Sequence, residues 1–132
     1  MKSALDLAKR YLELADRDIA AFNKMKNDPG FHVTTTCFHA QQGIEKCLKA
    51  VLVLNGIAFR KTHDLDELVD SLIARHISHP FESTTLSVMN PYAVLMRYED
   101  IEFAGVTPLE ADKIVVLVRR WAGEVVNESN RN

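Results

Sequence analysis

Three polar residues on one predicted helix are the first candidates for chemistry. Gln41, Glu45 and Lys49 are spaced four apart in a segment whose other residues are mostly apolar. At about 100° per residue they fall along one edge of the helix, at the border of its apolar stripe. Glu45 and Lys49 stand in the favourable i, i+4 order for an ion pair. Two interpretations stay open: a salt bridge that fixes helix register, or an anion or nucleotide contact through Lys49, with Glu45 orienting it.

Arg97 and Tyr98 form a second candidate site. An arginine beside an aromatic ring can stack on a base or clamp a phosphate, so this pair is a candidate for ligand binding. The alternative is that Arg97 pairs with one of the carboxylates that follow it and that Tyr98 packs at the end of the bundle. Those carboxylates are Glu99, Asp100 and Glu102.

His63 stands in a local basic cluster with Arg60 and Lys61, directly before a predicted helix capped by Asp64. A helix N-terminus attracts anions, although Asp64 at the cap would compete with them. A solvated loop is the alternative interpretation. The other histidines lack cysteine or carboxylate neighbours at metal-ligand spacing, so we expect no metal and no cofactor.

These candidates must be positioned by helices, because no segment shows the alternation of a strand. The first helix carries an apolar stripe from Leu5 to Phe22 and is ended by the Asp-Pro-Gly of residues 28–30. The second begins within residues 31–36, is apolar around most of its circumference, and is stopped by the Asn-Gly at 55–56. A helix with so little polar surface is expected at the centre of a bundle.

Three further helical segments follow the central helix. The third should start at Asp64, with Glu67 completing a capping box. Residues 81–98 are helical in composition, with an interruption at the Asn-Pro of 90–91. The last helix should start at the Thr-Pro of 107–108. The sequence therefore predicts a single all-α domain over residues 1–132, an antiparallel up-and-down bundle of four long helices and one short helix.

The composition limits the class of protein. The chain has 132 residues, 47% apolar and 26% charged, with a net charge of −2, which is typical of a globular domain and gives no overall attraction to nucleic acid. No apolar run is long enough to cross a membrane, and the N-terminus does not resemble a signal peptide, so we expect a cytoplasmic protein. Cys37 and Cys47 lie about 15 Å apart along one helix, too far for a disulfide, and we expect them to fill the core.

Several segments together resemble the HEPN family, the higher eukaryotes and prokaryotes nucleotide-binding domains. They are Q-Q-G-I-E-K-C-L-K-A at 41–50, K-T-H-D-L at 61–65, Arg97-Tyr98, and Thr107 with Ala111. The resemblance implies a helical bundle, frequent homodimers and pairing with a minimal nucleotidyltransferase, in the manner of toxin–antitoxin systems. The family is also similar to the helical domain of aminoglycoside nucleotidyltransferases. Many members are ribonuclease toxins that use an Arg, four to six spacer residues and a His, brought together across a dimer.

The sequence departs from that ribonuclease pattern, because no Arg–His pair has the required spacing. We therefore expect a non-catalytic module that homodimerises and binds a nucleotide, a nucleotidyltransferase partner, or both. The ligand contacts would be Lys49, Arg97 and Tyr98. The alternative is a ribonuclease with a shifted pair, such as Arg97 with His63.

Two apolar stripes suggest the dimer interface. They lie on the first and last helices, and the central helix need not cover them completely. They consist of Leu5, Leu12, Ile19, Val118, Trp121 and Val125.

Overall fold

A computed structural model describes residues 3–82, 84–95 and 105–131 of the chain. Within these residues every regular element is helical, which confirms the all-α prediction. The elements are α1 (Ala4–Met25), α2 (Val33–Leu54), α3 (Leu65–Ala74), the 3-10 turn η1 (Ser87–Met89), α4 (Tyr92–Leu95) and α5 (Pro108–Arg131). None of the described helices has the length and apolar content that a bilayer-spanning segment needs.

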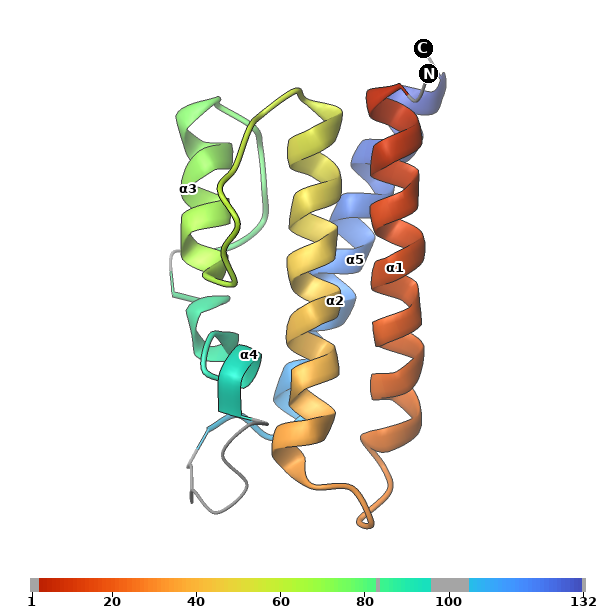
Figure 1. Cartoon of the computed structure of the whole chain (residues 1–132), viewed down its shortest axis with the longest axis vertical. Helices are drawn as coiled ribbons and strands as arrows, with labels where there is room; N and C mark the ends of the chain where they lie inside the picture. The colour runs from red at the N-terminus through yellow and green to blue at the C-terminus, as the bar shows by residue number, and fades with distance from the viewer. Residues whose placement is uncertain (1–2, 83, 96–104, 132) are drawn as a thin grey trace.

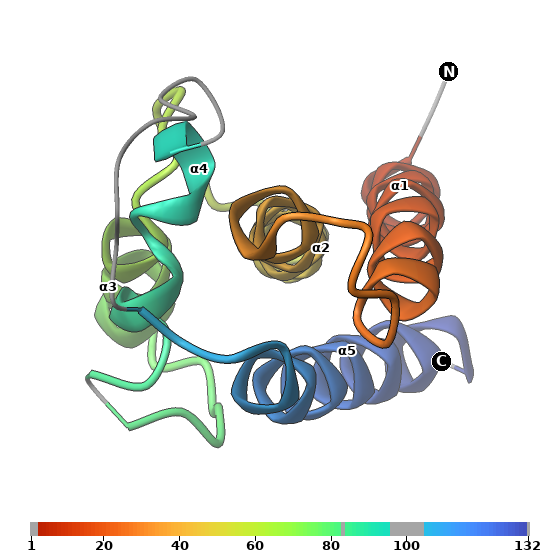
Figure 2. The same cartoon turned by 90° about the horizontal axis from the view of Figure 1, so that it is seen from below.

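Helix α2 is the centre of the fold, as its composition predicted. It packs against α1, α3, α4 and α5, and an end-on view places it among them (Figure 2). Its apolar residues include the fully buried Ala40 and Leu48. Gly43 allows α1 to approach closely, because a Cβ atom there would lie 2.9 Å from Ile19 Cγ1. Because neighbouring helices cover most of α2, only a narrow part of its surface is left for its few polar side chains to reach solvent.

The helix directions differ in part from a strict up-and-down order. Helix α1 runs opposite to α2, and the two chain termini lie at the same end of the bundle (Figure 1). Helices α3 and α5 run in the same direction as α2. Between α2 and α3, and again between α3 and α5, the chain runs back along the bundle in segments that form no long helix where they are described. The first return, residues 55–64, follows Gly56, whose φ of 67° ends α2 in the left-handed region that glycine tolerates.

The fourth long helix predicted over residues 81–98 is not formed in the part of that range that is described. The structure has η1 there and the four-residue α4 instead. Asn90 and Pro91 separate the two elements. The Asn90 side chain is held at the N-terminus of α3, because its carboxamide oxygen accepts a hydrogen bond from Leu65 N–H at 2.9 Å. This tertiary contact competes with a continuous helix, so the described bundle has three long helices.

Two predicted caps have different outcomes. At α5, Glu110 N–H donates to Thr107 Oγ1 at 3.1 Å and Thr107 N–H to Glu110 Oε1 at 3.4 Å, which confirms that start signal. At α3, Asp64 caps the helix by accepting from Asp66 N–H at 3.0 Å. Glu67 does not complete the box there, because its carboxylate is bound by Arg60.

The apolar stripes proposed for dimerisation are mostly used within the chain. Leu12, Val118 and Trp121 are buried, and the other three residues of the two stripes pack against the same core. The argument for a dimer from these stripes is therefore not supported, although dimerisation itself remains a prediction. Among the described residues, the large apolar side chains that stay exposed lie elsewhere: Leu7, Phe31, Val33, Ile73, Val88, Val94, Leu109 and Val116.

Candidate functional site

The ladder on α2 forms the expected ion pair. Lys49 Nζ lies 3.0 Å from Glu45 Oε2. The Glu45 side chain is only 4% exposed and that of Lys49 14%, so this pair is much drier than a surface salt bridge. Lys49 Nζ also lies 5.6 Å from the centre of the Phe59 ring, within the range of a cation–π contact.

His63 is the third member of this group. Its Nδ1 lies 2.8 Å from Glu45 Oε1, although the two residues are 18 positions apart in the chain. An ionised carboxylate can only accept, so the Nδ1 atom must carry the proton that it shares with Glu45. The His63 side chain is 55% exposed. One buried carboxylate therefore connects a partly buried ammonium group to an imidazole at the surface. We call Glu45, Lys49 and His63 the Glu45 site.

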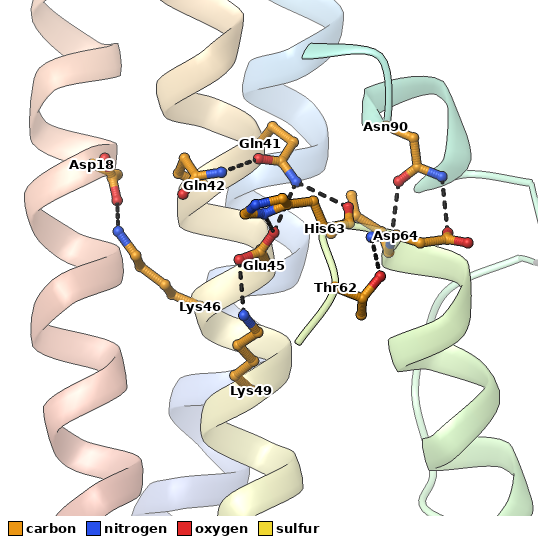
Figure 3. Close-up of polar contacts among 11 residues, drawn as sticks. Asp18, Gln41, Gln42, Glu45, Lys46, Lys49, Thr62, His63, Asp64 and Asn90 are labelled. Carbon is orange, nitrogen blue, oxygen red and sulfur yellow. Dashed lines mark hydrogen bonds and ion pairs between the residues drawn. The ribbon is translucent and has the colours of Figure 1, made fainter. Parts of the chain in front are cut away.

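Gln41 holds the Glu45 site in place from inside the protein (Figure 3). Its side chain is fully buried, and its Nε2 donates to Glu45 Oε1 at 3.2 Å and to the His63 carbonyl at 3.4 Å. Its own oxygen accepts from Gln42 Nε2 at 2.5 Å. These contacts fix both the carboxylate and the loop that carries His63, so the geometry is set before any ligand arrives.

The N-terminus of α3 is already occupied by side chains, which disfavours the anion site considered there. Asp64 caps it, and Asn90 Nδ2 donates to Asp64 Oδ1 at 3.1 Å while Asn90 also accepts from Leu65 N–H. Arg60 is exposed and bound to Glu67, and this hydrogen bond lowers the pKa of the Glu67 carboxyl. The local basic cluster thus contributes His63 to the candidate site, whereas Arg60 is turned to α3.

The structure brings together three of the five candidate ligand-binding residues, namely Glu45, Lys49 and His63. Arg97 and Tyr98 lie outside the described residues. The role of Asn90 was missed, because Asn-Pro at 90–91 indicated only an interruption of a helical segment. Its contact with Asp64 joins segments 26 positions apart, and no local pattern signals such a contact.

Known proteins that are similar to this chain include the following two. A protein of Methanocaldococcus jannaschii named "Putative toxin MJ1304" is 37% identical over 54 residues, which is 41% of this chain and 34% of that protein. The matched segment thus spans about a third of the relative's length. The crystal structure of ST0689, an archaeal HEPN homologue, aligns with a TM-score of 0.61 over 97% of this chain and 98% of that one. At 22% identity this likeness shows the shared fold alone.

The resemblance first noted in the sequence motifs extends along almost the whole chain. It includes the segment that carries Glu45 and Lys49 and the segment that carries His63. The model of the HEPN domain matches residues 4–127, and the chain belongs to the HEPN domain family.

Proposed function

We propose that this chain is the binding module of a toxin–antitoxin-like pair, which homodimerises and binds a nucleotide, a minimal nucleotidyltransferase partner, or both. The observation that carries the ligand-binding part of the proposal is the Glu45 site. A solvent-facing imidazole is held at Nδ1 by a buried carboxylate, which leaves Nε2 for a ligand. When protonated, this imidazole donates a charge-assisted hydrogen bond, as a phosphate ligand requires.

The family and the named relative support the biological setting. The chain belongs to the HEPN domain family, and the resemblance to that family implies pairing with a minimal nucleotidyltransferase. The M. jannaschii relative bears the name of a toxin. The match covers only about a third of that relative, so its name alone does not assign a partner to this chain. The nucleotidyltransferase partner is therefore a proposal, which is tested directly.

A ribonuclease is the second candidate, and the same contact favours it. A carboxylate bound to Nδ1 orients an imidazole and fixes its tautomer, which is what a general acid or base needs. Against this candidate, the sequence lacks the Arg-x(4–6)-His spacing of the family's nucleases. We therefore expect the purified protein to leave RNA intact. RNA cleavage that is lost in His63→Ala would establish the ribonuclease instead.

The partner and the nucleotide are tested separately. Affinity capture of the tagged chain from its native lysate, followed by mass spectrometry, should identify a nucleotidyltransferase. Calorimetric titration with nucleotides should give binding that weakens in His63→Gln. His76→Asn is the control, because His76 is an exposed histidine that lies beyond the end of α3 and outside the Glu45 site. Asparagine replaces it because asparagine also adopts the positive φ of 58° found at His76. If no nucleotidyltransferase is captured and no nucleotide binds, the proposal is wrong.

The dimer is tested by light scattering at micromolar concentration. A mass near twice 14.9 kDa is expected, and a mass near 14.9 kDa would remove dimerisation from the proposal. This measurement is independent of the Glu45 site, because that site is complete within one chain for the residues described.

A further inference from the structure

A second carboxylate on the same side of the bundle has the same set of partners as Glu45. Asp18 of α1 accepts from Lys46 Nζ through Oδ2, and its Oδ1 lies 3.1 Å from His39 Nδ1. The Asp18 side chain is 14% exposed, and the Lys46 and His39 side chains are each 26% exposed. We call Asp18, His39 and Lys46 the Asp18 site.

The two sites lie next to each other along α2. Lys46 and Lys49 are three residues apart, so their Cβ atoms are about 5–6 Å apart on neighbouring positions of the helix surface. Lys46 points toward Asp18 on α1, and Glu45 and Lys49 lie beside it toward His63 (Figure 3). Gln42 emerges between the two sites and is bonded to Gln41. The partly exposed edge of α2 thus presents two ammonium groups and the imidazole of His39, and the loop before α3 brings the imidazole of His63 to Glu45 beside them.

Each site is electrically balanced while its histidine is neutral, since one carboxylate faces one lysine. In that state Nδ1 carries the proton and Nε2 is an acceptor, which disfavours an anion. Protonation turns Nε2 into a donor and gives the site a net positive charge. An anion and a proton therefore favour each other's binding at each site.

The charged groups that the structure places against the two imidazoles support this linkage. His39 faces Asp18 of α1, whose other oxygen is bound to Lys46 of α2. His63 faces Glu45, whose other oxygen is bound to Lys49. Asp64 follows His63 in the chain, but its carboxylate is turned to the N-terminus of α3 and to Asn90.

We propose that the Asp18 site and the Glu45 site form one face that binds a chain of at least two phosphate groups, with uptake of a proton at each imidazole. The proposal rests on the proposed function for the Glu45 site and adds the Asp18 site to it. The ligand is either the polyphosphate of a nucleotide or successive phosphates of an RNA strand, because both offer anions at adjacent positions. A single phosphate would engage one site only.

The competing explanation is that the Asp18 site is structural and only ties α1 to α2. His39→Gln separates the two explanations, because a glutamine amide can still donate to Asp18 but cannot take up a proton. His63→Gln makes the same change at the Glu45 site, and His76→Asn is again the control. Circular dichroism checks that each variant is folded, and Lys46→Gln serves as a second variant if His39→Gln is not.

The experiment is calorimetric titration with ADP, AMP and a short single-stranded ribo-oligonucleotide, each in buffers of different ionisation enthalpy. The dependence on the buffer gives the number of protons taken up. The wild type should take up more protons with ADP than either histidine variant. His39→Gln should weaken ADP binding about tenfold, as expected for the loss of a hydrogen bond to a charged group, and change AMP binding little.

The outcomes separate this inference from the function on which it rests. If His63→Gln weakens ADP and oligonucleotide binding but neither His39→Gln nor Lys46→Gln does, the Asp18 site is structural and the inference is wrong. If the wild type binds none of the three ligands, or His63→Gln binds them as the wild type does, the nucleotide site of the proposed function fails as well. Binding of the oligonucleotide but not of ADP would identify RNA as the source of the phosphates.

Discussion

The Glu45–Lys49 pair should be the most sensitive electrostatic contact of the described fold. Replacing Glu45 by glutamine leaves the Lys49 ammonium without a counter-charge where it is mostly covered by protein. Breaking a buried pair in this way costs about 3–5 kcal/mol. We expect about 3 kcal/mol, because Lys49 retains some exposure and its contact with the Phe59 ring.

The double variant tests whether the loss comes from the unpaired charge. Lys49→Met alone should cost less than Glu45→Gln, because Gln41 and His63 still donate to the carboxylate. Glu45→Gln combined with Lys49→Met leaves no uncompensated charge, so it should be more stable than Glu45→Gln alone. A coupling free energy of about 2 kcal/mol is expected from this cycle.

Urea unfolding monitored by the fluorescence of Trp121, the only tryptophan, measures these free energies. The control is Glu13→Gln, which breaks the exposed i, i+3 pair of Glu13 with Arg10 and should change stability by about 0.5 kcal/mol or less. If Glu45→Gln changes stability no more than Glu13→Gln does, Glu45 and Lys49 interact as a solvated pair and the reasoning from burial is refuted.

Three other substitutions or conditions test the core. Leu48→Ala should cost about 2–5 kcal/mol in urea unfolding, because the side chain is fully buried; a loss typical of a surface substitution would contradict the central position of α2. Gly43→Ala should destabilise the fold, because overpacking against Ile19 costs about 1–3 kcal/mol whereas the better helix propensity of alanine contributes about 1 kcal/mol. Equal or higher stability would mean that α1 moves aside freely. Burial raises the thiol pKa of Cys37 to about 11 and of Cys47 to about 12. Because these thiols ionise at lower pH in the unfolded chain than in the folded one, stability should fall as pH rises from about 9 toward 11. The fall should be smaller in Cys47→Ala. A slope unchanged by that substitution would refute the assignment to Cys47.

The sequence predicted the helix ends that depend on local chemistry. Residues 28–30 stop α1, residues 55–56 stop α2, and Thr107 with Glu110 starts α5. In each case the signal is a backbone preference or a cap within three residues, which does not depend on the rest of the fold. The central place of α2 was also predictable, because a helix that is apolar on most sides has to be covered.

Contacts between distant segments could not be predicted in the same way. Glu67 had two possible partners, the Asp64 backbone and Arg60, and local spacing gives no measure of which is preferred. The interruption expected at Asn90 and Pro91 is present, because α4 begins at Tyr92, but the contact of the Asn90 amide with the first turn of α3 was not foreseen. His63 reaches Glu45 only because the chain returns along α2 after Gly56, a path that no motif encodes.

The partners of Glu45 separate a structural role from a functional one. A salt bridge that fixes helix register needs only Glu45 and Lys49, and well-packed apolar residues in their place are often as stable as such a pair. His63 adds little to burial, because more than half of its side chain faces solvent. Yet Gln41 is fully buried and uses its amide to hold both the Glu45 carboxylate and the His63 carbonyl. Stability alone does not require a surface imidazole to be held in a fixed position, so we propose that Gln41 orients this segment for a ligand bound through His63.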